Sequence, residues 1–530
     1  MSANVFILEP KSDIAPHAVG ENASPRKLRH VYTRACYLIL FSELLIAAGL
    51  RLLHLGDKSL WVDECASVLF AQQPWTAFWR TMWQGEANML SYYLLLRGWI
   101  HLGNTESTVR ILSVIPALLT VPCIYALGAR LFSVRTGLIA ALLLSLNACH
   151  IAYSQEARSY SLLLLCCTAS TLYFVKAIER PTAKNWSIYV FISVIGVYTH
   201  FFAGLLMLAQ WLTIAFLPPR MVRWRRLLAG AAAIGLLISP LLWFMFTRDV
   251  GQIDFIPHPG LRELYHLALF LASDGGKAVG GLLTIIYLAG IAAALWNFTA
   301  LRNDKSSPER WRFILIFNCL WAPIALDLCV SHLGKEIFYY RYLLICLPAF
   351  VLLAAYGFSC IPSRAWHALA LTTTAGLSLA AVGLYYSRPK DNWREATRYL
   401  VSNTHAGETV ILYPAYAELP FSYYQERFKP ASVTLNNRPQ LSNRISLSSD
   451  KPDHSDAVWL LSSRNDDNAA SMRQALSDRY QFQDELTYAE GIRLVRYFNR
   501  HPSNLAGGTV QTRDTGLFSY FVEGGAQQHE

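Results

Sequence analysis

Residues 37–64 read YLILFSELLIAAGLRLLHLGDKSLWVDE, an apolar run followed by a short polar stretch and two adjacent carboxylates, Asp63 and Glu64. The apolar part is long enough for a membrane-spanning helix, and no small-residue cleavage pattern follows it, so we expect a retained anchor. Ionisable groups at the edge of a membrane cost free energy unless they are solvated, paired or used. The pair Asp63-Glu64 is therefore the first candidate functional site.

The composition of the whole chain agrees with a membrane protein. Of its 530 residues, 53% are hydrophobic and 15% are charged, whereas soluble domains carry about 25% charged residues. The net charge is +10, but Lys and Arg lie in short loops between apolar stretches, which argues against nucleic acid as a partner. The ten cysteines form no C-x-x-C motif, so neither a disulfide framework nor a zinc site is expected.

Apolar runs of about 20 residues predict an α-helical polytopic membrane protein with about eleven transmembrane helices. Basic residues cluster in alternate loops, which places the N-terminus in the cytoplasm and Asp63-Glu64 on the outer face. The apolar segment 92–102 is shorter, and we expect it to lie along the membrane surface. The expected spans are 36–54, 108–129, 137–153, 160–178, 187–200, 201–217, 227–247, 277–299, 312–332, 341–360 and 365–386.

The composition changes after the last apolar run. Strand patterns at 409–413, 457–461 and 492–497, with helical patterns at 391–400 and 468–480, predict a small α/β domain on the outer side. The resulting division is a cytoplasmic tail (1–35), a transmembrane domain (36–386) with its first outer loop at 55–107, a periplasmic α/β domain (387–500) and a disordered tail (501–530).

The first outer loop holds the strongest catalytic candidates. Asp63 is predicted to act as a general base on an incoming hydroxyl, and Glu64 to orient it or help bind a metal. A structural alternative is an acidic pair that stabilises a helix N-terminus. The very short second outer loop adds Glu156 and Arg158. In the functional interpretation, Glu156 shares a divalent cation or an acceptor with Asp63, and Arg158 holds a phosphate. In the structural interpretation, the two side chains pair with each other and connect two helix ends.

Three further outer sites are weaker candidates for substrate binding. Arg341 stands among aromatic residues near Lys335, where the phosphate of a lipid would find positive charge, although snorkelling is the simpler reading. His200 lies at a tight outer turn, where a histidine is more often structural. Tyr93 either lines the same outer cavity or belongs to the surface helix.

These pieces together resemble a known group, the bacterial membrane glycosyltransferases of the GT-C fold. The group is glycosyltransferase family 39, which is related to protein O-mannosyltransferases and to the aminoarabinose and galacturonic acid transferases of lipid A and core sugars. The similarity covers roughly residues 36–420. The matching stretches are Ser59–Glu64, Tyr92–Leu96, Arg110–Ser113, Tyr153–Tyr160, Tyr198–Phe201 and Arg341–Leu343.

The resemblance implies transfer of a sugar from a polyprenyl phosphate to a lipid, glycan or protein acceptor on the periplasmic face of a bacterial inner membrane. It implies that Asp63 is the base, that Glu156 is the acid of the second outer loop, and that Arg341 and Lys335 hold the lipid phosphate. Many relatives have His-Pro-Pro where this chain has Asn88-Met89-Leu90-Ser91, which leaves the acceptor class open. A divalent metal bridging Asp63 and Glu156 is compatible with the pattern but not required by it.

A transporter or lipid flippase is the competing interpretation. Asp327, deep in the ninth expected span, is the residue that favours it. No internal repeat accompanies it, and the other key polar residues lie at the outer edge.

Overall fold

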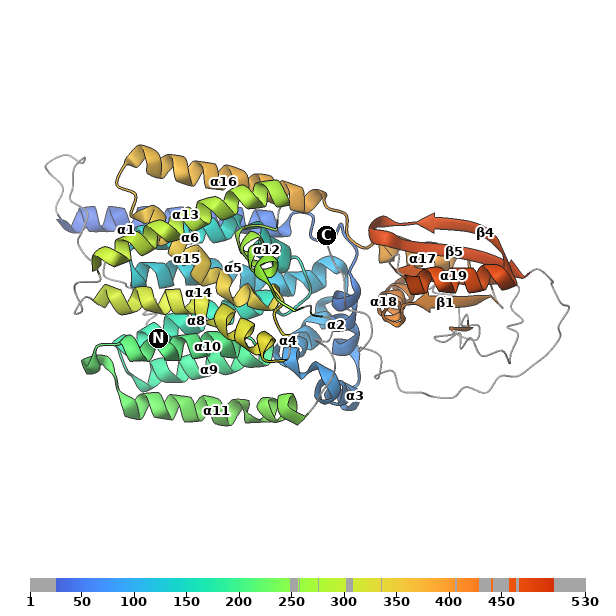
Figure 1. The fold of residues 1–530 in the computed structure, drawn as a ribbon, viewed down its shortest axis with the longest axis horizontal. Helices are drawn as coiled ribbons and strands as arrows, with labels where there is room; N and C mark the ends of the chain where they lie inside the picture. The colour runs from blue at the N-terminus through green and yellow to red at the C-terminus, as the bar shows by residue number, and fades with distance from the viewer. Residues whose placement is uncertain are drawn as a thin grey trace.

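The structure is a computed structural model that describes residues 25–247, 256, 258–274, 276–301, 308–334, 336–405, 408–428, 440–441, 457–463 and 467–499. Long helices run side by side, and a small sheet lies beyond one end of them (Figure 1). Every expected span is helical. The helices are α1 (Pro25–Leu52), α5 (Glu106–Leu131), α6 (Val134–Leu146) with α7 (Ala148–Ser154), α8 (Tyr160–Glu179), α9 (Ala183–Thr199), α10 (Ala203–Leu212), α11 (Trp224–Thr247), α13 (Lys277–Leu301), α14 (Pro308–His332), α15 (Leu347–Ser359) and α16 (Arg364–Ser387).

Eight of the described helices are long and apolar enough to cross a membrane, and nine if the bent pair α6–α7 is one span. The remaining two are shorter, because α9 has 17 residues and the apolar helical stretch that begins with α10 ends at Phe216. A helix rises 1.5 Å per residue, so these two reach less far across a bilayer of about 30 Å. The count of eleven spans therefore stays a prediction.

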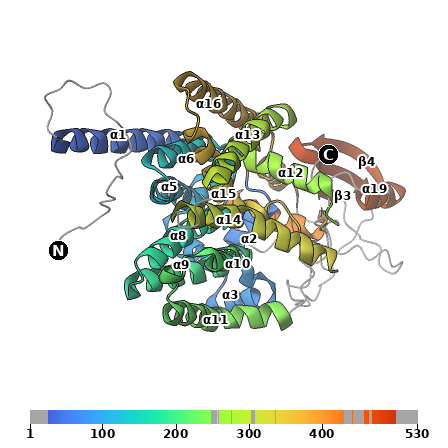
Figure 2. The ribbon, with the colours of Figure 1, turned by 60° about the vertical axis from the view of Figure 1, so that its left-hand side comes forward.

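The helices differ in how much of their apolar surface is buried inside the bundle. The segment that contains α15 runs through the middle, with 83% of its apolar window buried, whereas α1 and α16 lie at the periphery with 17% and 22% (Figure 2). Peripheral helices with apolar outer faces are expected of a protein solvated by lipid.

Three elements differ from the sequence-based expectation. Helix α1 begins at Pro25, about three helical turns before the expected span at 36–54, within the region assigned to the N-terminal tail. The loop expected at 248–276 contains an amphipathic helix, α12 (Leu261–Ala272), whose first turn is capped because Glu263 accepts a hydrogen bond from the Gly260 amide.

The third difference is a 60° bend between α6 and α7, in a segment expected to be one helix. Asn147 ends α6 and caps α7, since its side chain accepts a hydrogen bond from the His150 amide. The carbonyl groups of Leu144 and Ser145, freed at the break, accept hydrogen bonds from Arg51 of α1. A broken helix inside a bundle needs such partners, and here a buried cation supplies them.

The first outer loop folds into short helices between the bundle and the sheet (Figure 1). These are α2 (Val62–Gln72), α3 (Trp75–Thr81) and α4 (Leu90–Trp99). Helix α4 covers most of the apolar segment expected on the membrane surface, and its ten residues are too few to span a bilayer.

The C-terminal region forms the predicted α/β unit. Its sheet has the order β2-β1-β3-β5-β4, in which β1 pairs in parallel with β3, and β5 pairs antiparallel with both β3 and β4. The sequence reading missed α18, β2 and β4. The elements are α17 (Trp393–Asn403), β1 (Thr409–Tyr413), α18 (Glu418–Phe428), β2 (Gln440–Leu441), β3 (Ala457–Ser463), α19 (Asp467–Arg479), β4 (Tyr480–Thr487) and β5 (Ile492–Asn499). The expected tail at 501–530 lies outside the described residues.

The α/β unit packs against the first outer loop through one continuous apolar core, to which α2, α4, α17, α18 and the sheet all contribute. Polar contacts reinforce this packing around Glu106, at the start of α5. Its carboxylate pairs with Arg427 (2.7 Å) and Arg394 (3.3 Å) and accepts a hydrogen bond from the Tyr424 hydroxyl (3.2 Å). The loop that carries Asp63 is thus held between the bundle and the C-terminal region.

Candidate active site

Asp63 lies in the first turn of α2, where Trp61 is the residue before the helix. Its side chain is about one-third exposed (34%), in contrast to its neighbour Glu64. The Asp63 carboxylate faces the Arg158 guanidinium at 3.6 Å. A partly exposed carboxylate can be reached by an incoming hydroxyl, which a general base requires.

Glu64 is fully buried and surrounded by hydrogen-bond donors. Arg110 of α5 grips it with two nitrogens, each 2.8 Å from a carboxylate oxygen, and the Ala157 amide and the Lys390 ammonium donate at 2.9 and 3.1 Å. Burial alone would raise the pKa of Glu64, but the charges of Arg110 and Lys390 lower it to about 2. This geometry ties the first outer loop to α5 and to the second outer loop, so Glu64 fixes the position of Asp63.

Glu156 comes from the short turn between α7 and α8. Its side chain is 18% exposed, and one carboxylate oxygen lies 3.6 Å from the Lys390 ammonium. The other oxygen is buried and has no hydrogen-bond partner among the described residues. Burial raises the pKa of Glu156, the cations Lys390 and Arg341 lower it in part, and the carboxylates of Glu64 and Asp63 raise it further. Glu156 is therefore close enough to Asp63 and Glu64 for their charges to influence its pKa.

Arg158 joins this site to α4. Besides facing Asp63, its guanidinium donates to the Ser67 hydroxyl (3.3 Å) and to the Tyr93 hydroxyl (3.5 Å). Tyr93 in turn donates to Glu86 (3.1 Å). The Arg158 guanidinium thus pairs with Asp63 of the first outer loop, while the Arg158 backbone amide donates to the Glu156 carbonyl (2.8 Å), and no ion pair joins these two side chains in the part of the chain that the structure describes.

Arg341 and Lys390 stand beside the same aromatic ring. The Arg341 guanidinium lies 5.1 Å and the Lys390 ammonium 5.8 Å from the centre of the Trp61 indole. A cation near an indole face is attracted by the negative face of the ring. Two cations that converge on a partly buried ring create a positive region next to Glu156.

Two substrate-binding candidates remain, His200 and Lys335. His200 is buried at the end of α9, where its ring packs against Tyr342 (5.0 Å between ring centres) and one nitrogen accepts a hydrogen bond from the Phe202 amide. Asn88, which stands in the region where many relatives have histidine, accepts a hydrogen bond from the Phe201 amide in the same turn. Lys335 lies outside the described residues.

The structure adds two residues that the sequence reading did not select. Lys390 follows the last expected span in a polar stretch, where a single lysine gives no signal. Arg110 was noted only as part of a matching motif. An arginine in the first turns of an apolar helix needs a buried partner, and this requirement could have predicted that Arg110 pairs with Glu64.

The arrangement fits a resident metal ion poorly. No group of three or more His, Cys, Asp or Glu side chains that could hold a metal occurs among the described residues. The carboxylates of Asp63 and Glu156 each face a cationic side chain, Arg158 and Lys390, which a divalent ion would repel.

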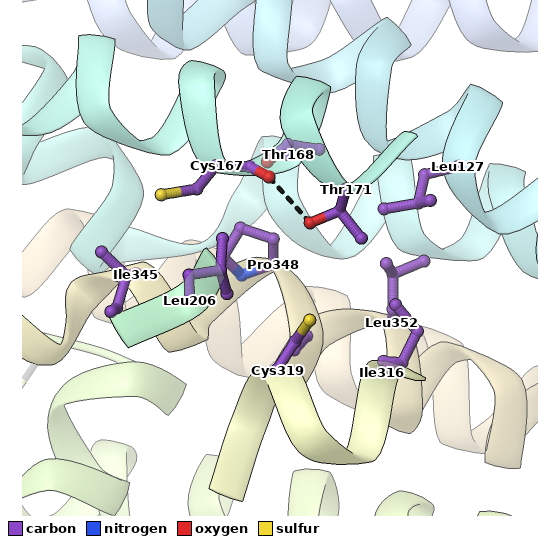
Figure 3. Close-up of a pocket in the computed structure, with 11 residues that line it drawn as sticks. Leu127, Cys167, Thr168, Thr171, Leu206, Ile316, Cys319, Ile345, Pro348 and Leu352 are labelled. Carbon is purple, nitrogen blue, oxygen red and sulfur yellow. Dashed lines mark hydrogen bonds between the residues drawn. The ribbon is translucent and has the colours of Figure 1, made fainter. Parts of the chain in front are cut away.

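A cavity between α5, α8, α10, α14 and α15, in the interior of the bundle, is too small for a sugar. Its volume is about 10 Å³, about one water molecule, and apolar side chains line most of it (Figure 3). Among its polar groups, the Thr171 hydroxyl is already bonded to the Cys167 carbonyl. This cavity is therefore not a sugar-binding site.

Comparisons with known proteins identify similar sequences and folds. Residues 89–244 match the family model described as dolichyl-phosphate-mannose-protein mannosyltransferase. A comparison of the sequence with curated proteins found no match.

Among solved structures, ArnT from Cupriavidus metallidurans in the apo state is similar, with a TM-score of 0.55 and 13% identity over 88% of this chain and 98% of that chain. The same protein bound to undecaprenyl phosphate matches with a TM-score of 0.52 and 14% identity over 92% of this chain and 100% of that chain. The predicted fold class is confirmed: the chain is an α-helical, multi-pass membrane protein with the GT-C fold of ArnT.

Proposed function

We propose that this protein transfers a sugar from a polyprenyl-phosphate donor to an acceptor hydroxyl on the outer face of a bacterial inner membrane. The observation that carries the proposal is the convergence of Asp63, Glu156, Arg158 and Arg341 at one end of a GT-C bundle. The acceptor is a lipid, glycan or protein. ArnT, which has the same fold, binds undecaprenyl phosphate, and this supports a lipid-phosphate donor.

Asp63 takes the role of general base in this proposal. Its carboxylate accepts the proton of the acceptor hydroxyl while the hydroxyl oxygen attacks the anomeric carbon. The bond between that carbon and the phosphate oxygen breaks, and the phosphate leaves with the electron pair. General base catalysis of this kind contributes about 10²–10⁴-fold.

The remaining site residues position the base and the charges. Arg158 orients the Asp63 carboxylate, and the Glu64–Arg110 pair fixes the loop that carries it. Arg341 stabilises the negative charge that develops on the departing phosphate, the role also expected of Lys335.

Glu156, Tyr93 and His200 are the proposed contacts to the sugar and the acceptor. Tyr93 is linked to the base through Arg158, while His200 packs beside Tyr342, the residue after Arg341. A site that holds both substrates turns a bimolecular encounter into a nearly unimolecular step.

The test compares polyprenyl-phosphate sugars and envelope glycans by mass spectrometry in wild type, a deletion strain and an Asp63→Asn strain. We expect one lipid-linked sugar to accumulate and one glycan to lose that sugar in both mutants. Asp57→Asn is the matched control, because Asp57 lies in the same loop but is exposed and pairs with His54. Unchanged glycans in an Asp63→Asn strain with normal protein levels would remove Asp63 from the role of base.

A transporter or flippase remains the second candidate because of Asp327. Its side chain is buried within α14, and neither carboxylate oxygen has a hydrogen-bond partner among the described residues. Transport would require Asp327 and not Asp63. An Asp327→Asn strain that reproduces the deletion phenotype while Asp63→Asn does not would favour transport.

A further inference from the structure

Lys390 belongs to the segment that follows the last apolar helix. It lies between α16 and α17, and 326 positions separate it from Glu64 in the sequence. Its ammonium nevertheless lies 3.1 Å from a Glu64 oxygen, 3.6 Å from a Glu156 oxygen and 5.8 Å from the centre of the Trp61 ring. The segment that leads into the α/β unit thus places a cation among the acids of both outer loops.

This placement is held by contacts on the C-terminal side of the lysine. The Ser59 hydroxyl donates a hydrogen bond to the Asp391 carbonyl. Arg394 donates to the carbonyl groups of Gly56 (3.3 Å) and Asp57 (2.7 Å). The stretch from Lys390 to Arg394 therefore follows the first outer loop, and the lysine is not a solvated surface residue: its side chain is only 22% exposed.

The charges around Lys390 leave it capacity for another anion. Glu64 is already neutralised by the two-pronged contact of Arg110. Glu156 lies beyond normal hydrogen-bond length from the ammonium. An ammonium has three donors, and one strong hydrogen bond to Glu64 leaves two for further partners.

The cluster as a whole is also positive. Its four carboxylates (Asp63, Glu64, Glu86, Glu156) stand against five cations, Lys58, Arg110, Arg158, Lys390 and Arg341. Arg158 is paired with Asp63 and Arg110 with Glu64, on one side of the site. Lys390 and Arg341 both lie beside the Trp61 ring, so this is the part of the cluster where two cations from different segments converge.

We propose that Lys390 and Arg341 form a two-cation clamp around Trp61 that binds the phosphate of the lipid donor. The clamp rests on the proposed function and adds to it a phosphate ligand supplied by the segment after the last apolar helix. Since the clamp and the Asp63–Arg158 pair involve different cations, the departing phosphate and the acceptor hydroxyl are served by separate charged groups.

The experiment measures equilibrium binding of undecaprenyl phosphate and of undecaprenol to the purified full-length chain. For Lys390→Gln we expect the Kd for undecaprenyl phosphate to rise about tenfold or more, with the Kd for undecaprenol unchanged. Lys390→Arg should restore most of the affinity. Arg388→Gln is the matched control, because Arg388 lies two residues away in an exposed pair with Asp274 and should leave both Kd values unchanged.

A second variant guards against loss of folding in Lys390→Gln. Lys390→His carries a positive charge at about pH 5.5 and none at about pH 8, so one folded protein reports both states. Its affinity for undecaprenyl phosphate should rise at the lower pH more than that of the wild type.

The results distinguish failure of the lipid-phosphate donor class from failure of the Lys390–Arg341 clamp. Wild-type binding that does not distinguish undecaprenyl phosphate from undecaprenol would contradict both the donor class and the clamp. Phosphate-dependent binding in the wild type that Lys390→Gln and Lys390→His leave intact would overturn the clamp alone.

Discussion

The adjacent carboxylates Asp63 and Glu64 should respond in opposite ways to the same chemical change. Replacing Glu64 by Gln removes the charge from a side chain that is fully buried and accepts five hydrogen bonds, from Arg110 (two), Ala157, Lys390 and Trp61. The glutamine amide group would face cationic donors, and the Arg110 guanidinium would be left buried without a counter-ion. Breaking a buried pair in this way costs about 3–5 kcal/mol.

We therefore expect Glu64→Gln to lower the thermal unfolding midpoint of the detergent-solubilised protein well below that of the wild type. Asp63→Asn should leave the midpoint close to the wild type, because Asp63 is partly exposed and its cation lies at 3.6 Å. Transfer activity should be lost in Asp63→Asn. Size-exclusion chromatography after stepwise heating measures the midpoint. Equal midpoints for Glu64→Gln and Asp63→Asn would refute the assignment of Glu64 as the residue that anchors the loop.

Three further predictions concern docking, orientation and pH. Glu106→Gln removes the negative charge that pairs with Arg427, so hydrogen exchange in α18 should become faster while the bundle helices stay protected; unchanged exchange in α18 would contradict the docking role. Arg158→Gln should reduce transfer about 10-fold or more with little change in unfolding midpoint, and Arg158→Lys should recover part of it, because the cation orients the Asp63 carboxylate; full activity in Arg158→Gln would contradict this. Because the pKa of Glu64 falls from 4.5 to about 2 on folding, its contribution to stability is complete above about pH 5 and is lost as the pH drops towards 2, so an acid unfolding curve should lose this component in Glu64→Gln.

The fold was largely readable from the sequence because lipid imposes a simple rule. Twenty apolar residues predict a helix whatever their partners, and all the expected spans are helical. The break at Asn147 was not readable, since the run 137–153 remains apolar on both sides of it. It depends on Arg51, about ninety positions away, to satisfy the freed carbonyl groups. Partners at such distances are set by packing and leave no local pattern.

Part of the candidate site could be predicted from the sequence, because charged residues next to apolar helices are unusual. Asp63, Glu156 and Arg158 stood out because acids and arginines beside apolar helices need a reason. Lys390 gave no such signal, since it lies in a polar stretch where lysine is common. Its place near Glu64 follows from the way the α/β unit packs on the first outer loop, which a reading of one segment at a time does not contain.

The contacts between the first outer loop and the C-terminal region also set an order in time. Leu60 donates its amide hydrogen to the Tyr424 hydroxyl, and these residues are 364 positions apart. At a synthesis rate of about 5–20 residues per second, the loop with Asp63 waits on the order of 20–70 seconds for this partner. Lys390 arrives only slightly earlier. A ribosome-bound or truncated chain that ends before Lys390 can hold its helices in the membrane, yet its charged cluster lacks one of its cations, so maturation of the site is a late event of biogenesis.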